Sequence, residues 1–182
     1  MFGVVVIDDD RQVLRSMEKA IPWKEMGVVC LGTGTDGKEG LQLIEELAPD
    51  IVITDIYMPV MDGLDMIREL RKRGYAGKII ILSGYSEFEY ARQALKLHVD
   101  DYLSKPATVA TIREVVEQAV QQLQEERREK ETQERLKQKI SLYETFLERQ
   151  WLKNVITGVR SNGVPQAYED EALFLQKYPL LE

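Results

Sequence analysis

Short apolar runs alternate with helix-like segments five times along the first part of this sequence. Four of the runs are rich in β-branched residues and lack alternating polar side chains, as strands buried on both faces do. Between the runs, apolar residues recur at the spacing of a helix face. This alternation predicts an α/β fold in which helices cover both faces of a parallel sheet. The expected strands are Val4–Ile7, Val28–Leu31, Ile51–Thr54, Ile79–Leu82 and Asp101–Leu103.

Glycine and polar residues mark the ends of several elements. Residues 32–37 contain three glycines and are expected to form a loop. Asp62 precedes a helix that starts at Gly63, and it is the expected N-cap of that helix. His98 follows a helix that ends at Leu97, a place where histidine tolerates the left-handed conformation.

The chemically interesting residues follow the ends of the expected strands. Asp8 and Asp9 follow the first strand, Asp55 the third, Ser83 the fourth and Lys105 the fifth. Parallel strands end at one edge of a sheet, so the three carboxylates converge if the first and third strands are neighbours. Carboxylates at such short distances repel one another. A hard divalent cation such as Mg²⁺, together with the lysine, cancels their charge. Helix capping would explain one or two of these acids, but not all of them together with a lysine.

These residues belong to a longer set of motifs, and with this set the sequence resembles the receiver domain of two-component response regulators. The resemblance covers roughly residues 1–122. It implies a flavodoxin-like, doubly wound parallel sheet of five strands in the order 2-1-3-4-5. The motifs are Asp8-Asp9, Asp55, Met58-Pro59, Asp62-Gly63, Ser83-Gly84 and Tyr102-Leu103-Ser104-Lys105-Pro106.

The resemblance implies that Asp55 accepts a phosphoryl group from a sensor histidine kinase. It also implies a bound Mg²⁺ (or Mn²⁺) with Asp9 and Asp55 as direct ligands, Asp8 as a ligand through water, and the backbone carbonyl of Tyr57. A carboxylate nucleophile needs mainly positioning and charge neutralisation, which these groups supply. The protein would then be a phosphoacceptor that assists its own phosphorylation, and not an enzyme.

The resemblance further assigns roles to residues around the acceptor. Ser83 would donate a hydrogen bond to the phosphoryl oxygens, Lys105 would form an ion pair with them, and Tyr102 stands at the aromatic switch position. Tyr57 and Tyr85 stand two residues after the acceptor and the serine, where attacking water is steered in this family. Both are bulky and lack a strong base at neutral pH, so we expect slow self-dephosphorylation.

Two alternatives use other motifs. Asp8 and Asp10 match the Asp-x-Asp of haloacid-dehalogenase-type phosphatases, with Asp8 as the nucleophile. However, Gln12 stands where that family has threonine or valine, and Asp55 stays unexplained. Gly32-x-Gly34-x-x-Gly37 matches a dinucleotide-binding motif, although it follows the second strand and not the first.

Composition argues against several kinds of partner. The formal net charge of −7 disfavours direct binding to nucleic acid or to an anionic membrane. No apolar run reaches the ~18 residues of a membrane span. Cys30 is the only cysteine, which excludes an internal disulfide and fits a reducing compartment. We therefore expect a cytoplasmic protein.

The helix after Pro106 is expected to continue through residues 123–157 as a coiled-coil linker. Residues 124–135 lack apolar side chains, and apolar residues then recur from Leu136 to Trp151. The receiver cannot cover this second stretch. A homodimer that pairs these helices is the simplest way to bury it.

Residues 158–182 are expected to be the start of a truncated further domain, with a turn over 161–165 and a short helix over 168–177. A receiver followed by a helical linker resembles the large AraC-type transcription regulators of Gram-positive bacteria. This sequence contains no helix-turn-helix signature, so DNA binding is expected only through an output domain outside it.

Overall fold

A parallel sheet of five strands forms the centre of the fold. The computed structural model describes residues 1–84 and 88–157, with the backbone alone for residues 88, 89, 150 and 153–157. The elements in chain order are β1 (Phe2–Ile7), α1 (Arg11–Ala20), the 3₁₀ helix η1 (Trp23–Met26), β2 (Val28–Gly34), α2 (Gly37–Leu47), β3 (Ile51–Thr54), α3 (Gly63–Lys72), β4 (Lys78–Ser83), α4 (Phe88–Lys96), β5 (Asp101–Ser104) and α5 (Val109–Thr157). The sheet order is β2-β1-β3-β4-β5, which confirms the expected doubly wound α/β fold.

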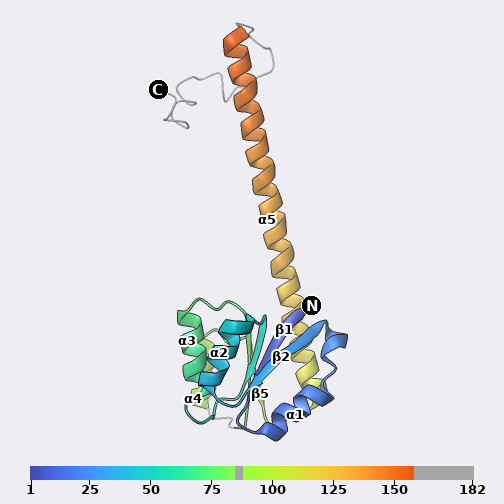
Figure 1. Ribbon diagram of the computed structural model, residues 1–182, viewed down its shortest axis with the longest axis vertical. Coiled ribbons are helices and arrows are strands. Elements are labelled where there is room, and N and C mark those ends of the chain that lie inside the picture. Colours follow the sequence, from blue (N-terminus) through green and yellow to red (C-terminus); the bar gives the residue numbers. More distant parts are fainter. Residues whose placement is uncertain (85–87, 158–182) are drawn as a thin grey trace. The chain divides into compact units, whose positions relative to one another are not determined.

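Helices cover both faces of this sheet (Figure 1). α1 and the first turns of α5 lie on one face, whereas α2, α3 and α4 lie on the other. Side chains alternate along a strand, so Val4 and Val6 pack against the first pair of helices and Val5 and Ile7 against the other three. Each large aliphatic side chain buried in this way contributes roughly 1.5–3 kcal/mol.

The register of the central strands brings their carboxyl ends level. Ile7 of β1 pairs with Thr54 of β3, and Thr54 pairs with Ile81 of β4. The amide of Asp55 donates to the carbonyl of Ile7 at 2.9 Å and so extends the pairing by one residue. The residues that follow these strands therefore meet at one edge of the sheet.

β2 is longer than the sequence indicates. The prediction of a loop over residues 32–37 is wrong for its first half, because Gly32 and Gly34 belong to β2 and pair with β1. Both glycines lie under α2, where an added Cβ would come within 3.3 Å of Leu47 or Leu43. Close packing of α2 on this strand therefore favours glycine there.

The local predictions of element ends agree with the structure. The carboxylate of Asp62 caps α3 by accepting from the amide of Asp65 at 2.7 Å. His98 follows α4 in the left-handed conformation, with φ at 53°. The hydroxyl of Thr108 accepts from the amide of Thr111 at 3.1 Å, and α5 begins one residue after this threonine.

α5 stays in contact with the sheet up to the end of the compact unit Met1–Arg128. Glu126 pairs with Lys78 at 2.9 Å, and Arg127 pairs with Asp50 at 2.8 Å. These pairs hold α5 against the amino edge of the sheet, past the boundary expected from the sequence.

The expected further domain at residues 158–182 lies outside the described residues, together with its turn over 161–165 and its helix over 168–177. No helix in residues 1–84 or 88–157 is long and apolar enough to cross a membrane.

Candidate functional site

Three carboxylates meet at the carboxyl edge of the sheet. Asp8 and Asp9 follow β1, Asp55 follows β3, and each offers an oxygen within 4.8 Å of the others. Asp8 and Asp55 are buried, at 2% and 7% exposure, whereas Asp9 is exposed. The cluster that the sequence predicts is therefore present, and its exposed member faces solvent.

Lys105 brings a positive charge to this cluster. Its ammonium group lies 2.6 Å from a carboxylate oxygen of Asp8 and 2.6 Å from one of Asp55. The backbone places it there, because the amide of Lys105 donates to the carbonyl of Ser83 at 2.7 Å just beyond the β4–β5 pairing. The peptide bond from Lys105 to Pro106 is cis. One ammonium among three carboxylates leaves the site with a net negative charge.

Burial shifts the protonation equilibria of this lysine and of Asp8. Burial raises the pKa of Asp8 above its ordinary value, and hydrogen bonds from Lys105 and from the amide of Asp10 offset this only in part. Burial lowers the pKa of Lys105, but its hydrogen bonds to Asp55 and Asp8 outweigh burial, so the net pKa is raised. Lys105 is therefore cationic at neutral pH, whereas the charge of Asp8 is incompletely compensated. Such a site favours a further cation.

A tight turn fixes the backbone around Asp55. The amide of Ile56 donates to the Asp55 carboxylate at 2.5 Å, and the amide of Gly63 donates to the carbonyl of Ile56 at 2.8 Å. A Cβ at Gly63 would collide with the backbone carbonyl of Asp55. The start of α3 can therefore pack this close to the acidic edge only with glycine at this position.

The loop between β3 and α3 carries two exposed large hydrophobic residues. Tyr57 is 39% exposed, and its ring meets the ring of Tyr90 on α4 edge-on, with centroids 5.3 Å apart and planes at 74°. Val60 is 81% exposed and has φ at 67°, a conformation that is rare for a β-branched residue. The sequence carries no local signal for either feature, because both depend on how the loop folds.

Ser83 and Tyr102 lie on neighbouring strands and share a hydrogen bond. Ser83 ends β4 and is fully buried, and Tyr102 packs against the apolar cluster under α2, α3 and α4. Burial raises the pKa of Tyr102 above its ordinary value, and the hydrogen bond with Ser83 offsets this in part. The phenol is therefore protonated at neutral pH. Tyr85 lies outside the described residues.

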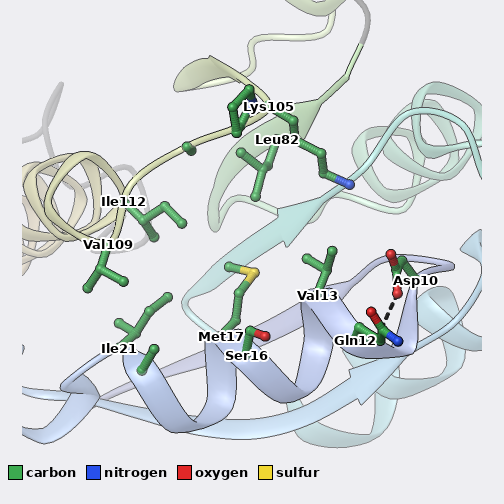
Figure 2. Close-up of a pocket in the computed structure, with 13 residues that line it drawn as sticks. Asp10, Gln12, Val13, Ser16, Met17, Ile21, Leu82, Lys105, Val109 and Ile112 are labelled. Atoms are coloured by element: carbon green, nitrogen blue, oxygen red, sulfur yellow. Dashed lines mark hydrogen bonds between the residues drawn. The ribbon is translucent and has the colours of Figure 1, made fainter.

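A groove of about 450 Å³ runs between α1 and the start of α5 (Figure 2). Met17 of α1 and Ile21 just after this helix line one side, and Ile112 of α5 lines the other. Lys105 and Asp10 also belong to its lining, so the groove borders the acidic edge. No sequence signal distinguished these apolar residues from ordinary core positions.

The structure does not support the two alternative motifs. Asp10, the acid/base of the phosphatase alternative, caps α1 by accepting from the amide of Gln12 at 2.7 Å. The amide of Gly37 donates to the carbonyl of Met61 at 3.0 Å, so the glycine motif is not an open phosphate cradle.

The chain is similar in sequence to curated proteins that are named as transcriptional regulatory proteins. The chain is 33% identical over 165 residues to the transcriptional regulatory protein YesN of Bacillus subtilis (strain 168), a match that covers 91% of this chain and 45% of YesN. It is 36% identical over 126 residues to the transcriptional regulatory protein HptR of Staphylococcus aureus, over 69% of this chain and 49% of HptR. The chain thus spans about half the length of the curated relatives it matches.

The family and the fold are also found by two independent comparisons. The receiver domain of AraT, a response regulator from Geobacillus stearothermophilus, superposes with a TM-score of 0.65 at 33% identity, over 69% of this chain and 98% of that chain. Residues 4–117 match the family model of the response regulator receiver domain. This match covers more than half of the sequence. The chain therefore belongs to the family of response regulator receiver domains.

Proposed function

We propose that Asp55 is the phosphoryl acceptor of this receiver. The observation that carries the proposal is Lys105, whose ammonium lies 2.6 Å from both Asp8 and Asp55. A carboxylate attacks a phosphoryl donor when it is positioned and when the charge of the incoming group is neutralised. The turn at Ile56 and Gly63 supplies the positioning, and Lys105 is placed to form an ion pair with the transferred group.

A divalent cation, Mg²⁺ or Mn²⁺, fits the rest of the site. The three acids offer hard oxygen ligands within 4.8 Å of one another, and the incompletely compensated charge of Asp8 favours a cation. We assign Asp9 and Asp55 as direct ligands, Asp8 as a ligand through water, and the carbonyl of Tyr57 as a further ligand. When bound, the ion neutralises charge on the phosphoryl oxygens.

Ser83 and Tyr102 are the proposed switch residues. Ser83 would donate its hydroxyl hydrogen to a phosphoryl oxygen on Asp55. Because Ser83 and Tyr102 share a hydrogen bond, this new bond changes the partner of the tyrosine as well. The change then reaches β5 and the helices beside it.

The test of the acceptor is phosphoryl incorporation from a small acyl phosphate in the presence of Mg²⁺, measured by intact mass. The parent chain should gain one phosphoryl group, and Asp55→Asn should gain none. Asp65→Asn changes an exposed acid of α3 and is the matched control, so it should be labelled like the parent. Undiminished labelling of Asp55→Asn would contradict the assignment.

The phosphorylated state is proposed to be long-lived. Tyr57 stands two residues after the acceptor and offers an aromatic ring in place of a group that could orient water. Tyr85 has the same place after Ser83, although it lies outside the described residues.

The proposed partners are a sensor histidine kinase upstream and a transcriptional output downstream. The output is inferred from the names of YesN and HptR, of which this chain spans about half, and from the resemblance to AraC-type regulators. DNA would be bound only by that output. The lone Cys30 is consistent with a cytoplasmic site of action.

A homodimer formed through the far part of α5 completes the proposal. Several large apolar side chains of this part are exposed in the single chain, and a second copy of α5 offers a matching apolar face. The exposed residues are Leu136, Ile140, Leu142, Tyr143, Phe146 and Leu152.

A further inference from the structure

Tyr90 is a residue of α4 that contacts the loop after Asp55. Its ring meets the ring of Tyr57 edge-on, with centroids 5.3 Å apart and planes at 74°. Tyr57 is 39% exposed, whereas Tyr90 is half-buried and packs against the apolar cluster under α2, α3 and α4. Tyr90 is therefore the anchored partner, and Tyr57 is the ring that rests on it.

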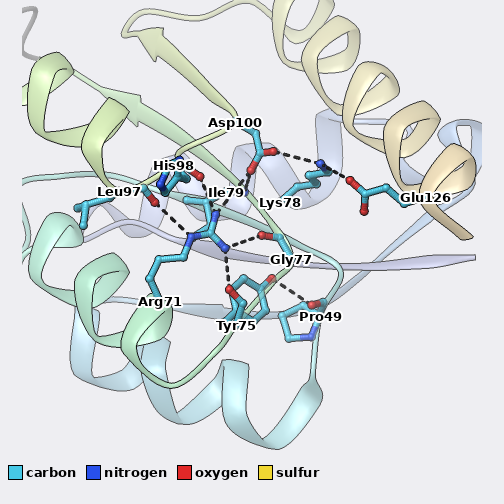
Figure 3. Close-up of polar contacts among 10 residues, drawn as sticks. All are labelled: Pro49, Arg71, Tyr75, Gly77, Lys78, Ile79, Leu97, His98, Asp100 and Glu126. Carbon is cyan, nitrogen blue, oxygen red and sulfur yellow. Dashed lines mark hydrogen bonds and ion pairs between the residues drawn. The ribbon is translucent and has the colours of Figure 1, made fainter. Parts of the chain in front are cut away.

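α4 is itself tied to the fold at its far end by Arg71 of α3 (Figure 3). The guanidinium donates to the carbonyls of Leu97 at 3.2 Å and His98 at 2.8 Å, where α4 ends. It also donates to the carbonyls of Tyr75 at 2.7 Å and Gly77 at 3.0 Å, just before β4. These charge-assisted bonds fix α4 relative to α3 and the sheet, and so give its tyrosine a defined position.

The contact between the two rings restricts the surroundings of the acceptor. Two residues of backbone span at most ~7 Å, so Tyr57 stands beside Asp55. The side chain of Asp55 is only 10% exposed. A bulky ring held two residues from a carboxylate this buried is placed to restrict the approach of water to it.

We propose that Tyr90 is a positioning residue that lengthens the lifetime of phosphorylated Asp55 by holding Tyr57. The inference rests on Asp55 as the acceptor. In the reaction that is slowed, a water oxygen bonds to phosphorus while the bond from phosphorus to the Asp55 oxygen breaks. The carboxylate is restored, and inorganic phosphate leaves with both hydrogens of the water. In-line attack needs this water opposite the leaving oxygen, and a mobile Tyr57 would admit it more often.

The test follows the loss of label after phosphorylation with a small acyl phosphate and Mg²⁺ and removal of the donor. Tyr90→Leu should lose the phosphoryl group about two- to twelvefold faster. This range corresponds to an edge-to-face contact of about 0.5–1.5 kcal/mol at ~1.4 kcal/mol per factor of ten. Tyr90→Phe keeps the ring and should decay like the parent. Leu95→Ala changes an exposed position on the same helix and should also decay like the parent.

A Tyr57→Ala background separates positioning from general loosening of α4. Tyr57→Ala should itself shorten the lifetime, and adding Tyr90→Leu should then cause no further change, because the held ring is gone. If the parent is labelled on Asp55, two results would overturn the proposal. One is an unchanged lifetime in Tyr90→Leu. The other is that Tyr90→Leu speeds phosphoryl loss equally in the parent and in Tyr57→Ala. A parent that takes no label would overturn the acceptor assignment together with this inference.

Discussion

Asp8 bears much of the electrostatic cost of the acidic edge. Burial raises its folded-state pKa above the unfolded value of ~3.9, so the folded state binds the proton more tightly than the unfolded state. The stability that comes from this preference is fully present below the unfolded pKa and is lost as pH rises through the folded pKa. At neutral pH the ionised carboxylate therefore lowers the free energy of unfolding.

Asp8→Asn should raise the midpoint of thermal unfolding at neutral pH in a metal-free buffer. A gain is expected because the amide removes a buried charge while Lys105 keeps Asp55 as its partner. The gap between the two proteins should close as pH falls toward the ordinary pKa of aspartate. Mg²⁺ should stabilise the parent more than Asp8→Asn. A gap that does not change with pH would contradict this account, and Glu114→Gln on the surface of α5 is the control.

Val60 adopts a left-handed backbone conformation that is unfavourable for a β-branched side chain. A left-handed conformation costs an L-residue roughly 1–2 kcal/mol, and glycine avoids that cost while losing some chain entropy. Val60→Gly should therefore raise the free energy of unfolding by about 0.5–1 kcal/mol in a urea titration. Val60→Ile keeps the β-branch and should bring no gain. Equal stability of Val60→Gly and Val60→Ile would show that the loop carries no such strain.

The sequence predicts which side chains meet at the acidic edge because topology alone decides it. Asp8, Asp55 and Lys105 follow strand ends, and parallel strands in the order that the family resemblance implies put those ends together whatever the loops do. The contact of Tyr57 with Tyr90 could not be predicted in this way. It depends on the path of one loop and on the position of one helix, and neither leaves a periodic signal in the sequence.

Elements were predicted well where local signals and packing agree. β1, β3 and β4 are apolar throughout because helices cover both of their faces. The predicted second strand ends before Gly32, because glycine usually marks a loop. In the structure β2 continues through Gly32, since this glycine allows α2 to pack closely on the strand. η1 was missed because its residues, Trp23–Met26, are held by a tertiary contact: the indole of Trp23 donates to the carbonyl of Met17 at 3.1 Å.

Arg71 joins α3 to the end of α4 and to the start of β4 (Figure 3). Arg71→Ala would remove its bonds to the carbonyls of Tyr75, Gly77, Leu97 and His98. Hydrogen bonds from a charged donor are worth roughly 1.5–3 kcal/mol each, but they share one donor group and water replaces some of them. We expect a loss of about 2–4 kcal/mol in the free energy of unfolding.

The control for this change lies on the same helix. Arg68 pairs only with its neighbour Asp65 on the surface, among the contacts described for it. Arg68→Ala should therefore change the free energy of unfolding by less than about 0.5 kcal/mol. A similar loss in both variants would mean that Arg71 acts only through helix propensity or surface charge.

At the scale of the whole chain, contacts divide the molecule into the units Met1–Arg128 and Glu129–Glu182. The loss of apolar residues after Leu123 indicates such a division in the sequence. The ion pairs of Glu126 and Arg127 keep α5 on the sheet beyond Leu123, so the division between the units lies further along α5. Sequence alone could not place this boundary, because Lys78 and Asp50 are distant in the chain.

The far part of α5 should pair with a second copy of itself. Ile140 is 51% exposed, Tyr143 71% and Phe146 57% in the single chain. Burying a large apolar side chain is worth roughly 1.5–3 kcal/mol, so several such residues repeated at helical spacing favour a paired helix strongly. Analytical ultracentrifugation at micromolar concentration should find the whole chain as a dimer and a fragment of residues 1–128 as a monomer.

Two single substitutions on α5 separate this pairing from a general change of charge. Ile140→Lys puts a charge on the apolar face and should shift the whole chain toward monomer, because an ammonium buried between helices lacks a partner. Thr145→Lys adds the same charge at an exposed position on the other side of the helix from Ile140 and Tyr143, and should leave the dimer intact. A monomeric parent, or a fragment that dimerises as well as the whole chain, would refute the pairing. Equal dissociation in the two lysine variants would instead show that the added charge, and not the apolar face, controls assembly.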